Sequence, residues 1–356
     1  MPATAAARMI LKKDPQVPFS ARESSLSDQA GIQSLLREML GIPEDARTIH
    51  PSVLDWKYWG PHPLVEDRRS RVIENDAQIV AHGGAWPIRL LTLDKTYSAF
   101  HLIDWAAKRH VPGAGVQVLR QWCGRADAAL IIGGSAMTRR ILPLCGFESQ
   151  NNITLLERPF APLCPALTES PHDWKMCARV ARNFMYYVFP KIGLPKSWST
   201  TLQNPADLSG ALWPKALFAN QAVSFRSAKL LTHLAGCPEI NKSACFLLQR
   251  NEIPVAYFFL MQVRNQVRLA DYGPAGLDER TSLVLGMAAQ SAALANFPDA
   301  ISLLAATSED KVRFGWRKAG LRIKVEEPIM MLKLNEELSV TDQFRLTLLD
   351  WDLLIL

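Results

Sequence analysis

The sequence predicts an α/β (α+β) protein of two tandem domains, each a mixed, mostly antiparallel sheet flanked by helices. Three observations predict this fold class. The length of 356 residues suits two domains of ordinary size. The composition, 48% hydrophobic and 21% charged, is typical of a globular chain with material for two cores. An order of helix, hairpins and alternating strands and helices occurs twice along the chain.

In the first half, residues 1–24 are expected to be a flexible lead-in, and residues 25–160 a domain. Its first helix has Ser27 as N-cap, an apolar face at helical spacing up to Leu40, and Gly41 as its end. The aromatic stretch Asp55–Trp59 is typical of a loop or short helix. Further elements are expected as strands at Arg71–Glu74, Gln78–His82, Ile88–Thr92, Phe100–Ala106 and Ala128–Ile132, and helices after Gly115 and at Ala136–Leu142.

In the second half, residues 161–224 are expected to be a linker and the helical opening of a second unit, and residues 225–356 the second domain. The expected elements are strands at Val255–Val263, Gln266–Asp271 and Ile301–Ala306, and helices at Glu279–Ala295 and Asp310–Ala319. The apolar tail from Leu348 to Leu356 is expected to pack as an extra strand or at an interface.

The two halves also agree in spacing. Val80 precedes Gly146 by 66 positions, and Val255 precedes Gly320 by 65 positions. Both glycines follow a helix and begin an apolar strand. This agreement favours a duplicated architecture.

One segment carries a chemical signal. A strand containing His101 and Asp104 leads into a turn with Gly113 and Gly115, and the turn leads into a helix. Glycines allow a ligand to approach the backbone closely, and a helix start presents free N–H groups and a positive dipole end to an anion. The segment is not a P-loop, because no Gly-Lys-Ser/Thr follows, and it lacks the third glycine of a dinucleotide fingerprint.

The segment His110-x-x-Gly113-x-Gly115 resembles the coenzyme A pyrophosphate turn of the GNAT (general N-acetyltransferase) superfamily, with His110 where Gln or Arg is usual. The later Gly146-Phe147 resembles the family's landmark at the end of a helix. The resemblance covers about residues 25–160 and, more weakly, 225–335, where no Gly-x-Gly turn follows the strand of Asp271. It implies a tandem GNAT-like protein that binds acyl-CoA, such as acetyl-CoA, in its first domain only.

The resemblance implies a set of cofactor contacts around this turn and at the start of the next helix. The expected cofactor-binding residues are Ala106, Lys108, Arg109, His110, Val111, Pro112, Gly113, Ala114, Gly115, Val116 and Ser135. Backbone N–H groups of the fourth strand would polarise the thioester carbonyl.

Asp104 is the candidate general base for the amine, or else a strand-end carboxylate paired with a neighbour such as Lys108. His82 is either a cleft residue or a hydrogen-bonded structural histidine. The position at which many family members carry a Tyr that protonates the thiolate is Leu142, which puts the usual acid in doubt.

The charge and cysteine patterns exclude several classes of protein. The net charge of +6 is dispersed, which argues against a nucleic-acid partner. Six cysteines at wide spacings without Cys-x-x-Cys predict neither zinc nor disulfides, and no metal is expected. No export signal or membrane span is recognised, so a cytoplasmic location is expected.

These observations leave three hypotheses. The first is an acyl-CoA-dependent N-acyltransferase, an N-acetyltransferase in its simplest form, acting on a small-molecule or peptide amine. The second is a non-catalytic GNAT-like acyl-CoA-binding or scaffold protein. The third is a Fem-type aminoacyl transferase.

Overall fold

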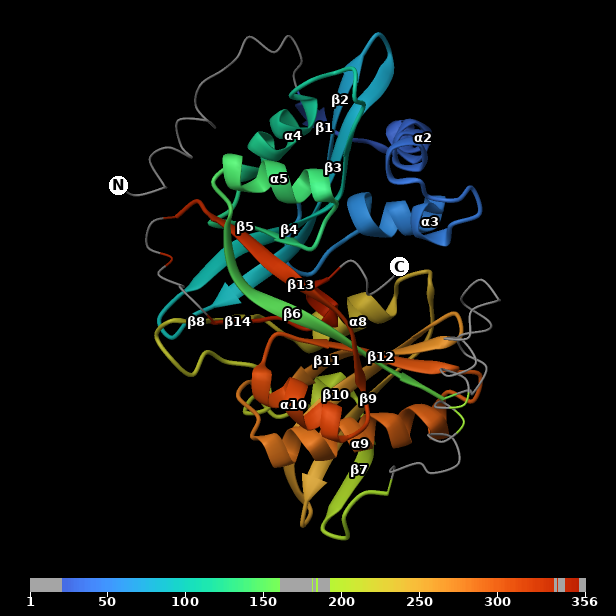
Figure 1. Cartoon of the computed structure of the whole chain (residues 1–356), viewed down its shortest axis with the longest axis vertical. Helices are drawn as coiled ribbons and strands as arrows, with labels where there is room; N and C mark the ends of the chain where they lie inside the picture. Colours follow the sequence, from blue (N-terminus) through green and yellow to red (C-terminus); the bar gives the residue numbers. More distant parts are fainter. Residues whose placement is uncertain are drawn as a thin grey trace.

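A computed structural model describes residues 21–160, 193–335 and 343–351, together with Ala181, Phe184 and Leu338. The first unit begins with a strand and two helical segments, continues with three consecutive strands, and then alternates helices and strands (Figure 1). Its elements are β1 (Ala21–Glu23), α2 (Gln29–Leu40), α3 (Pro51–Leu54) continued by a π-helical turn (Asp55–Trp59), β2 (Ser70–Asn75), β3 (Gln78–Leu91), β4 (Thr96–Ala107), α4 (Ala114–Cys123), β5 (Ala128–Ile132), α5 (Ala136–Leu144) and β6 (Glu148–Pro159).

The second unit repeats this order. Its elements are β7 (Trp198–Gln203), β8 (Gln221–Ser224), α8 (Ala228–Ala235), β9 (Ile240–Arg250), β10 (Ile253–Val263), β11 (Gln266–Gly273), α9 (Glu279–Asn296), β12 (Ser302–Thr307), α10 (Asp310–Lys318) and β13 (Arg322–Lys333). A C-terminal segment adds β14 (Gln343–Arg345) and a 3₁₀ turn (Leu348–Asp350).

All of these strands belong to one sheet, with the order β1-β2-β3-β4-β5-β13-β6-β12-β11-β10-β9-β7 and β8 and β14 beside β3. Along this order, only β4–β5 and β11–β12 pair in parallel, at corresponding places in the two units. Each unit contributes its last strand to the other. β13 lies between β5 and β6, and β6 lies between β13 and β12. The two sheets expected from the sequence are therefore a single sheet joined by strand exchange.

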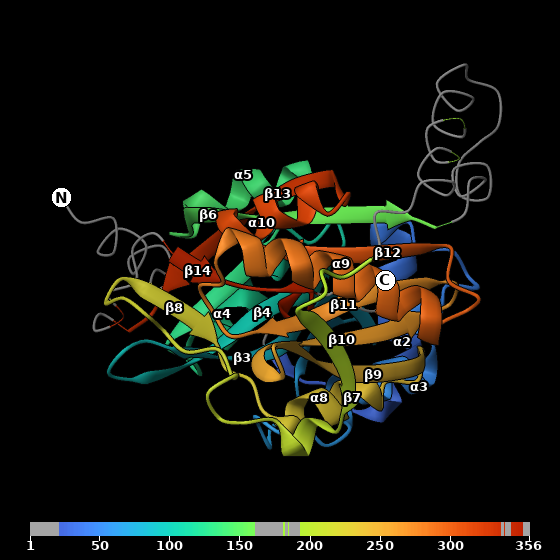
Figure 2. The same ribbon diagram turned by 90° about the horizontal axis from the view of Figure 1, so that it is seen from below.

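The helices cover the sheet on both faces. One face carries α2, α3 and α8, whose apolar residues form a core shared by both units, including Leu35, Val53 and Leu231. The other face carries α4 and α5 over the first unit, and α9 and α10 over the second, each pair with its own core. Figure 2, seen from below, shows α9 and α10 on the opposite side of the sheet from α8.

Several boundaries differ from the sequence predictions. β1 pairs with β2 and the Ser24 amide bonds to the Ser70 carbonyl (3.0 Å), so a flexible lead-in up to residue 24 is wrong for residues 21–24, while residues 1–20 lie outside the described residues. β3 is one strand, not two, and the sequence reading missed β9. In the range 161–224, Ala181 and Phe184 are helical, and residues 193–224 hold β7 and β8, which the sequence did not predict.

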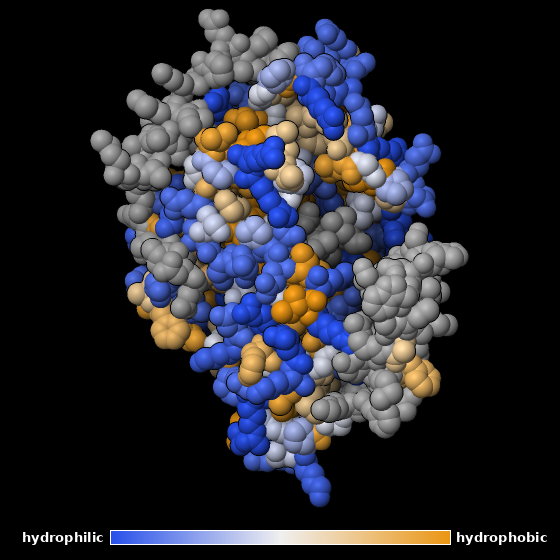
Figure 3. All heavy atoms as spheres, in the orientation of Figure 1, coloured by the Kyte–Doolittle hydropathy of each residue, from blue (hydrophilic) through white to orange (hydrophobic). Residues whose placement is uncertain are grey.

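Of the tail expected to pack from Leu348 to Leu356, residues 348–351 are described; they begin with a 3₁₀ turn and not a strand, and the strand β14 lies just before this tail. β14 pairs with β8, and Leu348, Leu349 and Trp351 are buried in the shared core. No described helix combines the length and the apolar character that crossing a bilayer requires. The face in Figure 3 is mainly hydrophilic, with apolar residues in small separate groups.

Candidate functional site

The candidate site begins where β4 and β5 part. The two strands pair only from Ala99–Ala128 to His101–Leu130. Beyond this point β5 continues against β13, while β4 runs on to Ala107 with β3 on its other edge. In the described part of the chain, no strand pairs with Leu102–Ala107 on the β5 side. We call this place the β4–β5 fork. Its backbone groups are available to a ligand.

The turn after β4 leads directly into α4. Gly113 is the N-cap residue, with a φ of 83°, a left-handed conformation that glycine adopts without a Cβ clash. No side chain caps this helix, and its first turn has no acidic residue. The free N–H groups and the positive end of the helix dipole therefore face outward and suit an anion.

The equivalent helix start in the second unit is closed by carboxylates. The Asp278 side chain caps α9 by accepting from the Thr281 amide (3.0 Å). Glu309 accepts from the Gly276 amide in the preceding turn (2.7 Å). Negative charge already occupies the place that an anionic ligand would take. This contrast matches the expectation that the pyrophosphate turn is restricted to the first unit.

The β11–β12 fork of the second unit is also filled. The segment from Phe344 to Trp351 lies in it, with Thr347 bridging Thr307 of β12 and donating to Asp271 of β11 (2.9 Å). Arg345 donates to the Tyr272 carbonyl and to Glu309. The second unit thus keeps the shape of the first but fills its own fork with protein.

The structure places the expected cofactor residues in different environments. Exposed positions are Arg109, His110, Pro112, Gly113 and Ser135; half-buried positions are Lys108, Gly115 and Val116; buried positions are Ala106, Val111 and Ala114. Val111 and Ala114 pack into the core under α4, so only their backbones are available to a ligand. The ring of exposed groups around Gly113 includes the cationic Arg109, which suits phosphate.

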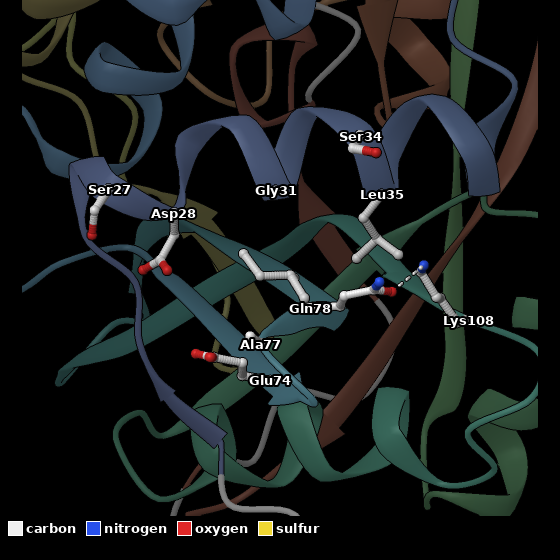
Figure 4. A pocket seen from close by; sticks show the side chains of 10 residues that line it. Ser27, Asp28, Gly31, Ser34, Leu35, Glu74, Ala77, Gln78 and Lys108 are labelled. Atoms are coloured by element: carbon white, nitrogen blue, oxygen red, sulfur yellow. Dashed lines mark hydrogen bonds between the residues drawn. The ribbon is translucent and has the colours of Figure 1, made fainter.

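Lys108 lies on the wrong face for this role. Side chains alternate along β4, with Trp105 and Ala107 packing towards α4 and Ala106 towards the opposite face. The Lys108 ammonium accordingly lines a surface pocket of about 470 Å³ beside α2, 3.5 Å from the Gln78 amide oxygen. Figure 4 shows this pair at one end of the pocket and Asp28 at the other. The backbone of Lys108, in contrast, belongs to the turn between β4 and α4.

Asp104 is held by an ion pair that the sequence did not indicate. Its side chain is 9% exposed, and its Oδ2 lies 2.9 Å from Nζ of the buried Lys57. The Tyr58 hydroxyl donates a short hydrogen bond to the same oxygen. Burial opposes ionisation, but Lys57 and the Tyr58 hydrogen bond together hold the pKa of this carboxyl below its usual range. The partner proposed from the sequence, Lys108, pairs with Glu38 instead (3.5 Å). A low pKa makes Asp104 a weak base.

Three other expected residues have structural roles. His82 is fully buried between the Ser70 hydroxyl and the Asp104 carbonyl (2.9 Å each), and burial lowers its pKa to about 4. Leu142 is fully buried in the core under α4 and α5. Ser135 caps α5 by accepting from the Thr138 amide (3.1 Å).

Two groups of residues at the site were not indicated by the sequence. Lys57 and Tyr58 meet Asp104 although they lie 47 and 46 positions away in the sequence, and the local signal was a lysine inside an aromatic run. Arg139 and Glu327 form an ion pair (2.8 Å) across the start of α5, beside the Gly133–Gly134 turn. No local sequence pattern predicts a contact between two residues that are 188 positions apart.

Comparison with known proteins gives results for structures only. No protein-family model and no curated protein matches the sequence. The N-myristoyltransferase of Saccharomyces cerevisiae, solved with bound myristoyl-CoA, is similar over 90% of this chain and 81% of its own, with a TM-score of 0.58 and 12% identity.

Two bacterial structures are also similar. A GCN5-related N-acetyltransferase from Anabaena variabilis is similar over 89% of this chain and 73% of its own (TM-score 0.54, 9% identity). An Enterococcus faecalis protein described as a probable N-acyltransferase is similar over 90% and 74% (TM-score 0.53, 10% identity). The chain therefore has the fold shared by GCN5-related N-acetyltransferases and N-myristoyltransferases.

Proposed function

We propose that the chain is an acyl-CoA-dependent N-acyltransferase that binds one acyl-CoA, in its first unit. The observation that carries this proposal is the difference between the two equivalent helix starts. The α4 start is uncapped and free of acidic residues in its first turn, whereas Asp278 and Glu309 occupy the α9 start and the turn before it. An anion is stabilised at the first and repelled at the second.

The residues present suit the phosphate end of acyl-CoA. Gly113 shapes the turn, and the amides that follow it meet the pyrophosphate, with exposed Arg109 nearby. The β4–β5 fork offers backbone groups of β4 to the thioester end, where an N–H can stabilise the charge that develops on the carbonyl oxygen. When bound, acyl-CoA supplies the activated acyl group that the amine attacks.

The acceptor is proposed to be an amine of a small molecule or a peptide, and the acyl group an acetyl group. The fold supports both in general terms, because similar structures include an N-acetyltransferase and an N-myristoyltransferase. Holding the amine next to the thioester supplies much of the rate.

A second candidate, a non-catalytic acyl-CoA-binding protein, is favoured by one observation about the described residues. Leu142 is a core residue and Asp104 is ion-paired, so neither the usual acid nor the candidate base is in place. A Fem-type aminoacyl transferase remains a third candidate, and dependence on charged tRNA identifies it.

Calorimetry tests the binding step, with acetyl-CoA and myristoyl-CoA as separate probes and free CoA as the reference. We expect a stoichiometry of one per chain. CoA release across a panel of amines then tests catalysis. Tight binding without CoA release for any amine or peptide favours the non-catalytic candidate, and no binding of any CoA species refutes the proposal.

A further inference from the structure

Asp104 occupies an unusual backbone position. It is in a β-bulge of β4, where the pairing with β3 shifts between His82–Ala106 and Gly84–Ile103. Its φ of 49° lies in the left-handed region, which L side chains other than Asn and Asp rarely adopt. The bulge comes just after the last β4–β5 pair, His101–Leu130, so it lies at the base of the fork. Backbone conformations of this kind persist only where the surroundings hold them.

The π-helical turn Asp55–Trp59 supplies what holds Asp104. Lys57, 1% exposed, gives the ion pair, and Tyr58, fully buried, gives the short hydrogen bond. The turn itself is held by the buried Arg69. Its guanidinium donates to the carbonyls of Trp56, Lys57 and Gly60 (2.7–2.9 Å). The Asp104 carbonyl faces His82 (2.9 Å). The side chain and the backbone carbonyl of Asp104 are therefore both anchored, and the charges of Asp104 and Lys57 are both buried away from water.

The second unit has a clamped carboxylate at the corresponding place, Asp271, although this residue is not among those with a positive φ. Asp271 lies five positions after Gln266, the first β11 residue paired with β12, as Asp104 lies five positions after Ala99 on β4. Its carboxylate accepts from the Tyr257 hydroxyl (2.6 Å) and from Arg226 Nε (2.9 Å), beside a bulge between β10 and β11. A clamped carboxylate next to the fork is thus retained where no acyl-CoA turn exists, which points to a role in backbone geometry.

We propose that Asp104 is a positioning residue of the acyl-CoA site: clamped by Lys57 and Tyr58, it fixes the bulge that sets the backbone of Trp105–Ala107 along the β4–β5 fork. This inference rests on the proposed function and assigns Asp104 a task other than proton transfer. The segment it positions receives the thioester end, while α4 holds the phosphate end. Damage to the clamp therefore weakens discrimination between acyl-CoA and CoA more than it weakens CoA binding.

Two variants that both lack the carboxylate separate the possible roles. Asp104→Ala loses the hydrogen bond to Tyr58 and places an alanine at positive φ. The double variant Asp104→Asn with Lys57→Met removes both charges together, keeps an acceptor for Tyr58, and has a residue that tolerates positive φ. A positioning role predicts a damaged single variant and a working double variant, whereas a base role predicts that both are equally inactive.

The first readout is the ratio of the CoA and acetyl-CoA dissociation constants from calorimetry. We expect Asp104→Ala to reduce this ratio by about tenfold and to retain the affinity for CoA. Tenfold is the effect of losing one hydrogen bond to the polarised thioester carbonyl. The double variant keeps the wild-type ratio. An unchanged ratio in Asp104→Ala overturns the proposal, as does equal loss in both variants.

The second readout needs no ligand. Amide hydrogen exchange of the peptide spanning His101–Lys108 should be about tenfold or more faster in Asp104→Ala, and wild-type-like in the double variant. Unchanged exchange overturns the positioning role of Asp104, whether or not the wild type binds acyl-CoA. A wild type that binds no acyl-CoA refutes the proposed function separately. If Asp104→Ala does not fold, Tyr58→Phe takes its place, with faster exchange expected and unchanged exchange contradicting the clamp.

Discussion

The indole N–H of Trp105 donates to the backbone carbonyl of Gly115 (2.9 Å), joining the end of β4 to the first turn of α4. A glycine favours this contact, since a Cβ on Gly115 would lie close to the indole nitrogen (3.3 Å) and to the Ala107 Cβ (3.4 Å). The uncapped helix start and the β4–β5 fork are thereby fixed relative to each other. A ligand that spans both depends on this distance.

Gly115→Ala should therefore shift α4 away from β4 and weaken acetyl-CoA binding. We expect a loss of about 1 kcal/mol, or about fivefold in affinity, typical of a small overpacking. Gly124→Ala at the other end of α4 is the matched control, because its Cβ meets nothing within 4 Å. Calorimetry measures both. Equal affinities in the two variants contradict a ligand that bridges the helix and the fork.

Leu142→Ala should lower stability and leave acetyl-CoA binding unchanged. Leu142 is fully buried in the core under α4 and α5, and truncating such a leucine typically costs about 2–5 kcal/mol. Leu144→Ala, on the same helix but 66% exposed, is the control. Urea unfolding gives the free energy of each. Loss of CoA release without loss of stability would instead give position 142 a part in the chemistry.

Arg226→Met should destabilise the protein strongly without affecting acetyl-CoA affinity. Arg226 is buried between Asp271 (2.9 Å) and Asp350 (2.6 Å), and its removal leaves two buried carboxylates without their cation. Breaking such a pair typically costs about 3–5 kcal/mol. The control, Lys318→Met, removes an exposed ion pair with Glu279 and should cost less than about 1 kcal/mol. Chemical denaturation distinguishes them, and similar stabilities refute the structural role of this network.

Acidification should weaken the contact between the two units. His62 and His233, one from each unit, have ring centroids 4.6 Å apart. Burial, with the nearby Arg69, lowers the pKa of His62 to about 2 and that of His233 to about 4. In the unfolded chain these histidines bind protons near pH 6.5, whereas in the folded chain they stay neutral. Their contribution to the unfolding free energy is therefore fully present above pH 6.5 and decreases as the pH falls towards 4.

The variant His233→Gln tests this origin. It should flatten the decline in unfolding free energy between about pH 6.5 and 5.5, a window above the ordinary carboxylate pKa values of about 3.9 to 4.3. Urea unfolding at several pH values provides the slopes. A variant slope equal to that of the wild type contradicts the assignment.

Local patterns predicted the elements around the site well. The strand Ala128–Ile132 and the turn leading into α4 follow from an apolar run and from two glycines, signals contained within a few residues. The expectation that the second unit lacks the acyl-CoA turn also rests on a local signal, the missing Gly-x-Gly, and it stays a prediction. The structure adds that Asp278 caps the equivalent helix.

Long-range relationships were beyond the sequence. The exchange of β6 and β13 leaves no local mark, because it is a pairing between strands that lie far apart in the sequence. The Lys57–Asp104 pair and the Thr347–Asp271 contact also join distant segments, and their partners are decided by the assembled sheet. The partner of Asp104 and its positive φ were therefore not foreseen, and its part in the site stays a prediction.

The most direct test of the central claim, acyl-CoA binding at the uncapped start of α4, compares Gly113→Asp with Gly113→Asn by calorimetry with acetyl-CoA. Asp and Asn have the same shape and both tolerate the left-handed φ of 83°, so the pair differs in charge alone. Because a carboxylate repels phosphate strongly at a few ångströms, we expect Gly113→Asp to bind about 100-fold more weakly than Gly113→Asn. Equal affinities of the two variants for acetyl-CoA would contradict the account.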